Sequence, residues 1–184
     1  KGETSHYKIP YDYLICSNGT AIFDRDDNLI FQNTILIDTV KKTLRYLNKF
    51  GFIKSIELMD AYGRTTANYN EATSITCTLR FRNTLDTRKV MEEISFLSAF
   101  SFMNIVVFKE EFDKTDGIYI VSDIEGVDKK DIYTIGDASN DKGMLLEFNG
   151  YKMPYSYPEI MFSRARLTSS VKSLVRKIER KSHE

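Results

Sequence analysis

The stretch DIYTIGDASNDKGML, residues 131–145, decides the fold of this chain. It begins with a short β-branched and aromatic run, residues 132–135, which predicts a buried strand. The strand ends in a Gly-Asp pair that contributes Asp137, and Asn140 and Asp141 follow within the next few positions. Carboxylates at the carboxyl end of a buried strand are a common way for an α/β protein to hold a hard cation, because Mg²⁺ takes oxygen ligands. The sequence therefore predicts an α/β protein with a cation site at this loop.

The spacing of the loop residues predicts that an anion could bind beside the cation. A short helix is expected over residues 142–148, ended by Asn149-Gly150. If the loop turns directly into that helix, Asp137, Asn140 and Asp141 all lie toward its amino end. Backbone N–H groups at that end also attract anions such as phosphate. From spacing alone the alternative is equally open, namely that these are only loop and capping residues.

The first part of the chain predicts a strand followed by a hairpin. Residues 13–16 form a continuous apolar run closed by Ser17-Asn18-Gly19, which is typical of a strand buried on both faces. Residues 20–23 and 29–32 flank a polar loop at 24–28, which is the pattern of a β-hairpin.

The middle of the chain begins with an amphipathic helix. Asp38 is positioned to cap it, and Val40, Leu44 and Leu47 form its apolar face. Gly51 follows where a left-handed residue commonly ends a helix.

A second group of elements follows this helix and predicts an α+β layer. In residues 75–81 apolar and polar positions alternate, so one face of that strand should pack and the other should meet water. A helical stripe is expected over residues 90–97, and strands over 105–108 and 118–121. The alternating positions are Ile75, Cys77, Leu79 and Phe81, and the stripe consists of Val90, Met91, Ile94 and Leu97.

The C-terminal segment predicts an amphipathic helix with a basic end. Thr168 or Ser169 can cap it, and cations suit the negative end of the helix dipole. The basic residues favour a solvated helix end over a nucleic-acid patch, because 26 Lys and Arg balance 26 Asp and Glu. The apolar positions are Val171, Leu174, Val175 and Ile178, and the basic ones are Arg176, Lys177, Arg180 and Lys181.

Composition indicates an ordinary globular protein, with 42% hydrophobic residues and no net charge. Cys16 and Cys77 lie inside apolar runs and are interpreted as small buried hydrophobes in a reducing compartment, so a cytoplasmic location is expected. No apolar run approaches the roughly 18 residues of a membrane span. We therefore expect neither nucleic acid nor a membrane as partner.

Two segments resemble one family. Residues 136–145 read G-D-x-x-N-D-x-x-M-L, which is similar to the fourth motif of the haloacid dehalogenase (HAD) superfamily in its Cof-type phosphatase branch. Residues 14–24 resemble the Cof-type segment that follows the second motif. This resemblance implies a Rossmann-like α/β core with a parallel sheet and an inserted α+β cap domain. The expected domains are core residues 1–36, cap residues 37–112 and core residues 113–184.

The resemblance also implies roles for individual residues. Asp137 would be a Mg²⁺ ligand, Asp141 would support the metal site, and Asn140 would orient the phosphate or the attacking water. Asn18 and Gly19 would lie beside the same cleft and contribute to substrate binding. The implied reaction is Mg²⁺-dependent hydrolysis of a small phosphorylated metabolite, such as a sugar phosphate, through an aspartyl-phosphate. The alternative is a non-catalytic binding or regulatory module with the same fold.

Part of the family pattern does not occur in these 184 residues. The nucleophile segment D-x-D-G-T and the Ser/Thr motif are absent, so the catalytic residues stay unassigned. The ten residues between the expected strands 118–121 and 132–135 are also too few for a parallel crossover, which predicts a lost piece near Ile124 with the catalytic Lys. Lys129 and Lys130 do not occupy that position.

Two explanations for these gaps compete. Either residues of a longer protein are omitted from the sequence, or the chain is a natural remnant that cannot perform the family chemistry. Omission is favoured, because losing the first strand would leave buried backbone groups of the sheet unpaired.

Overall fold

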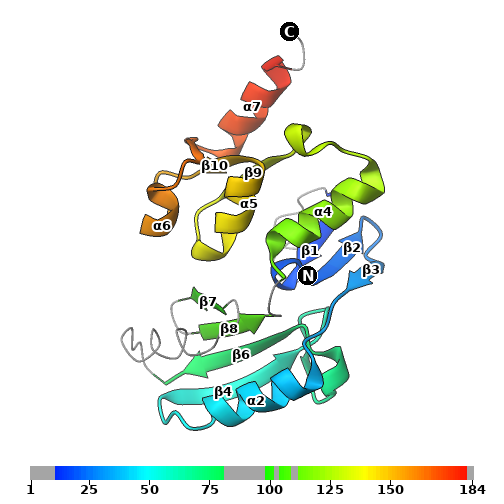
Figure 1. The fold of residues 1–184 in the computed structure, drawn as a ribbon, viewed down its shortest axis with the longest axis vertical. Helices are drawn as coiled ribbons and strands as arrows, with labels where there is room; N and C mark the ends of the chain where they lie inside the picture. The colour runs from blue at the N-terminus through cyan, green and yellow to red at the C-terminus, as the bar shows by residue number, and fades with distance from the viewer. Residues whose placement is uncertain (1–10, 81–97, 102–103, 109–111, 182–184) are drawn as a thin grey trace. The chain divides into compact units, whose positions relative to one another are not determined.

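The computed structural model describes residues 11–80, 98–101, 104–108 and 112–181 (Figure 1). The chain divides into two compact units, residues 1–117 and 118–184. Helix α4 (Lys114–Glu125) contains the boundary between them. The expected domains 1–36, 37–112 and 113–184 stay a prediction.

The first unit begins with a three-stranded antiparallel sheet of order β1-β2-β3, formed by β1 (Tyr13–Cys16), β2 (Ala21–Asp24) and β3 (Leu29–Gln32). The predicted hairpin is confirmed by the antiparallel pairing of β2 with β3. The expectation for β1 is wrong, because it pairs antiparallel with β2 and all four of its residues are only half-buried. An antiparallel edge strand needs only one packed face, and the run of apolar residues does not distinguish this case from a strand buried on both faces.

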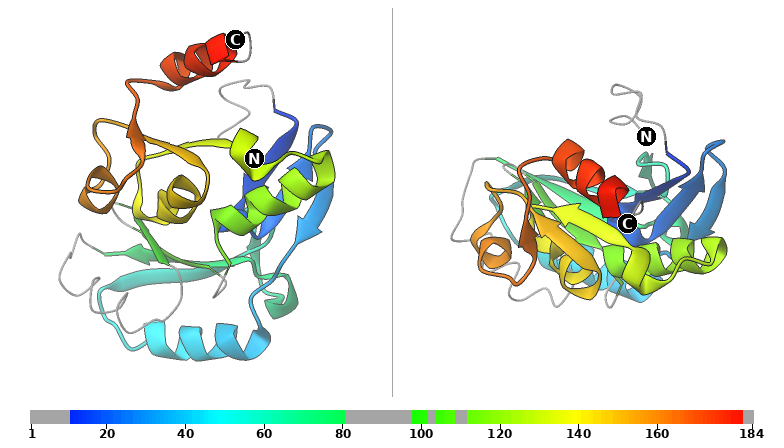
Figure 2. Two further views of the ribbon diagram at one scale, coloured as in Figure 1. Left: turned by 45° about the horizontal axis from the view of Figure 1, so that its top comes forward. Right: turned by 90° about the horizontal axis from the view of Figure 1, so that it is seen from above.

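A five-stranded antiparallel sheet forms the rest of this unit, in the order β5-β4-β6-β8-β7. Helix α2 (Ile37–Leu47) packs along it, as Figures 1 and 2 show. The predicted alternation is confirmed on β6, since Ile75, Cys77 and Leu79 are buried against α2 while the threonines between them are half-exposed. Burial raises the pKa of the Cys77 thiol to about 12. The strands are β4 (Ile53–Met59), β5 (Thr65–Thr66), β6 (Ser74–Leu79), β7 (Ser98–Ser101) and β8 (Asn104–Phe108).

The helix predicted after Asp38 is confirmed, but both of its predicted ends are wrong. Leu36 occupies the N-cap position and Asp38 lies in the first turn, where its charge still suits the helix dipole. At the other end the Asn48 side chain donates to the Leu44 carbonyl oxygen at 2.9 Å. Gly51 is not among the left-handed residues. A side-chain amide therefore performs the capping expected of glycine.

The second unit contains a parallel sheet of order β11-β10-β9, which confirms the predicted α/β fold. Its strands are β9 (Tyr133–Gly136), β10 (Asn149–Lys152) and β11 (Arg166–Leu167). Helix α5 (Lys142–Glu147) connects the first two and packs on both (Figure 2), and α6 (Pro158–Met161) precedes β11. Asn149 and Gly150 start β10 directly after α5. A Cβ at Gly150 would lie 1.9 Å from the Leu145 carbonyl oxygen, so glycine permits this tight joint.

The strand predicted over residues 118–121 is wrong, because these residues belong to α4. The helix begins with reciprocal capping. The Asp113 carboxylate accepts from Thr115 N at 2.6 Å, and the Asp116 carboxylate accepts from Asp113 N at 2.7 Å. A helix therefore precedes β9, and the reason for expecting a lost piece near Ile124 no longer holds.

The C-terminal helix is confirmed as α7 (Val171–Lys181), with a different cap. The Ser170 side chain accepts from Ser173 N at 3.1 Å, whereas Thr168 donates to the Ser170 carbonyl oxygen. Leu174 is buried, and Val171 is 56% exposed. Two sequence predictions, the Phe81 position and the helical stripe over 90–97, lie outside the described residues.

Within the described part of the chain, no helix combines the length and the apolar character needed to cross a membrane.

Candidate functional site

The loop after β9 is organised by the carboxylate of Asp141. Its Oδ2 accepts hydrogen bonds from the backbone N–H groups of Asp137 and Ala138, both at 3.0 Å. The Asp141 side chain is buried, and the residue closes the short 3₁₀ turn η4 (Ser139–Asp141) that leads into α5. Asp141 therefore fixes the backbone of the residues on which the predicted cation site depends.

Gly136 makes this arrangement sterically feasible. A Cβ at this position would lie 2.5 Å from Cβ of Asp141 and 2.7 Å from its Oδ2. Such contacts are far inside van der Waals distance, so any side chain here would push the carboxylate away. The Gly-Asp pair at the end of β9 and the later Asp141 are thus one structural unit.

Asp137 presents the remaining carboxylate of the loop. Its backbone carbonyl accepts from Tyr157 N at 2.8 Å, which ties the loop to the segment before α6. Among the described residues its half-buried carboxylate has no hydrogen bond or ion pair. Asn140 is half-buried in the same turn. The structure therefore brings the three predicted loop residues together and leaves one carboxylate available for a ligand.

This donor set suits a hard cation in kind but does not complete a site. Mg²⁺ binds carboxylate oxygens and usually retains several waters. The part of the chain that the structure describes contains no group of three His, Cys, Asp or Glu side chains arranged to hold a metal. Asp137 is the residue that would hold the cation, since one oxygen of Asp141 already accepts two N–H groups.

The predicted substrate-binding pair, Asn18 and Gly19, lies in a strained turn of the first unit. Ser17, Asn18 and Gly19 form η1 (Ser17–Gly19) with φ values of 48°, 57° and 104°. Left-handed non-glycine residues cost about 1–2 kcal/mol each, and such strain often occurs at functional sites. Thr20 stabilises the turn by donating to the Ser17 carbonyl oxygen at 2.8 Å.

The start of α4 packs directly on this turn. A Cβ at Gly19 would lie 2.1 Å from the Asp113 carbonyl oxygen and 3.3 Å from Lys114 N. A Cβ at Gly117, one turn further along the helix, would lie 3.0 Å from Cα of Gly19. The two glycines therefore allow the helix start to touch the turn, and place Lys114, the first residue of α4, beside Asn18 and Gly19 in the chain's fold.

Sequence reasoning missed Lys114 because it placed a strand where α4 lies. A usable signal was present, since Asp113 and Asp116 have the spacing of a capping box just ahead of the apolar run. Lys129 and Lys130 are engaged elsewhere, in exposed ion pairs with Glu147 at 2.6 Å and Asp128 at 3.2 Å.

The predicted site residues thus fall into two groups. Asp137, Asn140 and Asp141 share one loop of the second unit, and Asn18 and Gly19 share one turn of the first. Their meeting at a common cleft stays a prediction.

Comparison with known proteins identifies the fold. No protein-family model and no curated protein sequence matches the chain. Among solved structures, a phosphatase of the HAD superfamily from Bacteroides thetaiotaomicron is 20% identical, with a TM-score of 0.74 over 95% of this chain and 75% of that one.

Two further structures agree. A HAD subclass IIB sugar phosphatase is 15% identical, with a TM-score of 0.74 over 98% of this chain and 79% of that one. A HAD/COF-like hydrolase from Plasmodium vivax is 15% identical, with a TM-score of 0.71 over 99% of this chain and 75% of that one. The resemblance found in the sequence is therefore confirmed at the level of the fold: this chain has the fold of the HAD superfamily phosphatases.

Proposed function

We propose that the protein is a Mg²⁺-dependent phosphatase of a small phosphorylated metabolite, such as a sugar phosphate. The observation that carries the proposal is the loop after β9, where buried Asp141 fixes the backbone and the Asp137 carboxylate is left without an intramolecular partner among the described residues. A carboxylate held ready in this way suits a cation better than a structural role. The HAD phosphatase fold of the chain agrees with this interpretation.

In this proposal the residues of the loop have distinct roles. Asp137 holds Mg²⁺, Asp141 positions the loop through its two backbone hydrogen bonds, and Asn140 orients the phosphate or the attacking water. The bound cation would neutralise charge on the phosphoryl oxygens.

Lys114 is proposed as a second cationic group that binds the phosphate. It starts α4 beside the Asn18 and Gly19 turn, and its backbone N lies 3.3 Å from the position of a Cβ on Gly19. A lysine there would act as a point charge on a phosphate held near the turn.

The nucleophile is proposed to lie on residues outside these 184. Within the described residues β9 pairs only with β10, so one edge of this parallel sheet is open. Thr134 in the middle of β9 is buried, so a backbone group of β9 that faced this edge without a partner would cost about 1–3 kcal/mol. A further parallel strand at that edge would satisfy such a group and would end beside Asp137, where an aspartyl nucleophile is needed.

The rival proposal is a non-catalytic binding module. It is distinguished by assaying the full-length protein with p-nitrophenyl phosphate, with and without Mg²⁺. We expect turnover that requires the metal, and Lys114→Gln to lower kcat by about 100-fold because a charge-stabilising group is lost. Lys129→Gln is the matched control and should leave kcat unchanged, since its ammonium pairs with Glu147 on the surface. Absence of metal-dependent turnover in the full-length protein would favour the binding module.

A further inference from the structure

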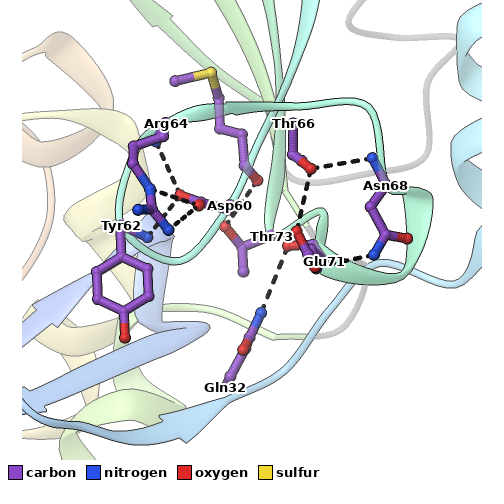
Figure 3. A network of polar contacts seen from close by, with 9 residues as sticks. Gln32, Asp60, Tyr62, Arg64, Thr66, Asn68, Glu71 and Thr73 are labelled. Carbon is purple, nitrogen blue, oxygen red and sulfur yellow. Dashed lines mark hydrogen bonds and ion pairs between the residues drawn. The ribbon is translucent and has the colours of Figure 1, made fainter.

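The turn between β4 and β5 holds an arginine in a fixed position (Figure 3). Asp60, which is 8% exposed, accepts through Oδ1 from the backbone N–H groups of Tyr62 and Arg64, both at 2.9 Å. Through Oδ2 it accepts from Nε of Arg64 at 2.9 Å and from Nη2 at 2.8 Å. One buried carboxylate thus forms both the backbone turn and a two-point contact with the guanidinium.

The guanidinium is also supported from a second side. Its central carbon lies 4.6 Å from the centroid of the Tyr62 ring, and Figure 3 shows the two side chains next to each other. The Arg64 side chain is nevertheless 70% exposed, and within the described residues Nη1 makes no hydrogen bond. Because the side chain is already ordered, a ligand that binds the exposed edge would lose little conformational entropy.

The ion pair itself is not needed to form the turn. The Asp60 N–H donates to the Arg64 carbonyl oxygen at 2.9 Å, and the Gly63 N–H donates to the Asp60 carbonyl oxygen at 3.0 Å. The carboxylate bonds to the two backbone N–H groups are independent of the guanidinium. The pair is open to water on the arginine side, where the Arg64 side chain is 70% exposed, so its contribution to stability is small. Folding of the turn therefore does not explain why the guanidinium is held in this orientation.

The turn lies against the part of the first unit that contains the candidate substrate-binding residues. Ala61 packs in one cluster with Ala21 and Phe23, and the Tyr62 ring lies 5.2 Å from the Phe23 ring. Thr73 connects the base of the turn to η1, because its hydroxyl contacts the Met59 carbonyl oxygen and the Ser17 hydroxyl, both at 3.2 Å.

We propose that Arg64, oriented by Asp60 and Tyr62, determines specificity by binding an anionic group of the substrate other than the phosphate that is removed. The inference rests on the proposed phosphatase function. The ligand is a phosphate ester that carries a second phosphate or a carboxylate, both of which accept from the exposed edge of a guanidinium. Stacking of a planar base is disfavoured, because the guanidinium already covers a face of the Tyr62 ring.

The test compares substrates that differ in the second group. The full-length protein is assayed with glycerol 3-phosphate, 2-phosphoglycolate and 1,3-propanediol bisphosphate, which offer a neutral, a carboxylate and a phosphate group. Arg64→Met should lower kcat/KM for whichever anionic ester is preferred by about 10- to 100-fold, mainly through KM, because a charge-assisted contact is lost. The value for glycerol 3-phosphate should change less than about twofold, since that ester does not use the contact.

Arg25→Met is the matched control. Arg25 is also exposed and paired with an aspartate, Asp12, at 2.5 Å. Its substitution should leave kcat/KM unchanged for all three esters. Because the result is a ratio between substrates, a general loss of folded protein does not mimic it. Equal effects of Arg64→Met on the neutral and the charged esters, or no effect on any of them, would overturn the proposal.

A binding measurement separates this inference from the proposed function. Affinity for the same three esters is measured by calorimetry without Mg²⁺, using the protein with Asp137→Asn, alone and combined with Arg64→Met. If no ester is hydrolysed but an anionic ester binds in an Arg64-dependent manner, the phosphatase proposal fails and the role of Arg64 stands. If hydrolysis occurs and binding does not depend on Arg64, the reverse holds.

Discussion

Two acidic loops of this molecule are built by the same device and differ in what they leave available. In the hairpin loop after β2, Asp24 Oδ1 accepts from two backbone N–H groups of its own loop, at 2.9 and 2.8 Å. In the loop after β9, Asp141 Oδ2 does the same at 3.0 Å twice. The hydrogen-bond pattern of a carboxylate that closes a loop is therefore no sign of a binding site.

The surroundings of the two loops separate them. The second oxygen of Asp24 accepts from the Asn28 side chain at 2.9 Å, in a surface loop between antiparallel strands. Asp141 is buried at the end of a parallel sheet, and the loop that it fixes presents the Asp137 carboxylate without an intramolecular partner among the described residues. The candidate ligand is therefore the carboxylate that takes no part in closing its loop, which here is Asp137.

The strongest way to test this contrast is to neutralise one carboxylate in each loop. Asp137→Asn in the full-length protein should lower Mg²⁺-dependent hydrolysis of p-nitrophenyl phosphate by at least about 100-fold, because a charged ligand is lost. Asp26→Asn, the same charge change in the hairpin loop, should leave the rate unchanged. Circular dichroism should show both variants folded. Unchanged turnover with Asp137→Asn would reject this residue as a ligand.

The second test removes the closing carboxylate of each loop. Asp141→Ala should lower the free energy of unfolding by about 2–4 kcal/mol, since two half-buried N–H groups lose their acceptor. Asp24→Ala should change the urea midpoint much less, because water can replace the lost acceptor at the surface. Equal shifts for the two variants in urea unfolding would show that burial does not distinguish the loops.

The third test concerns the close approach beneath the loop after β9. Gly136→Ala should cost about 1–3 kcal/mol, because the added Cβ would meet Asp141 at 2.5 Å. Gly51→Ala is the control, with no atom within 4 Å of its added Cβ and no left-handed φ. It should be neutral or slightly stabilising in the same thermal unfolding measurement. A neutral Gly136→Ala would contradict the tight joint.

The smallest expected effect is an acid response of the hairpin loop. Hydrogen bonds from the Asn28 side chain and backbone hold the pKa of Asp24 below its ordinary value of 3.8. A lowered folded-state pKa contributes stability above 3.8 that is lost as the pH falls through the folded value. Asp24→Asn should therefore make the urea midpoint depend slightly less on pH between pH 5 and pH 2, roughly the window in which an aspartate titrates. If the urea midpoint of this variant has the same pH dependence as that of the unchanged protein, Asp24 does not contribute to the acid response.

The sequence was sufficient for the elements whose patterns are local. The alternation on β6 and the hairpin loop after β2 can be recognised from residues that are neighbours in the sequence. The same is true of β9 and the acidic loop that follows it. The strand prediction for residues 118–121 was wrong because their β-branched residues favour a strand. The helix is specified instead by the capping pair ahead of them, Asp113 and Asp116.

The candidate site was only partly predictable for the same reason. Asp137 and Asp141 lie close in sequence, so their spacing indicated a shared loop. Lys114 depends on contact between α4 and Gly19, and Arg64 depends on a turn that packs on Phe23. These contacts join distant parts of the chain, and no local pattern of the sequence reveals them.

The buried thiol of Cys77 has a practical consequence for work on this protein. With a pKa of about 12 and no exposed surface, it holds almost no reactive thiolate at neutral pH. Alkylation would have to wait until β6 separates from its neighbours, so the labelling rate of a Cys16→Ser variant would report how often the five-stranded sheet opens. The alkylation rate of this one native thiol can thus measure the stability of the sheet, without any added probe.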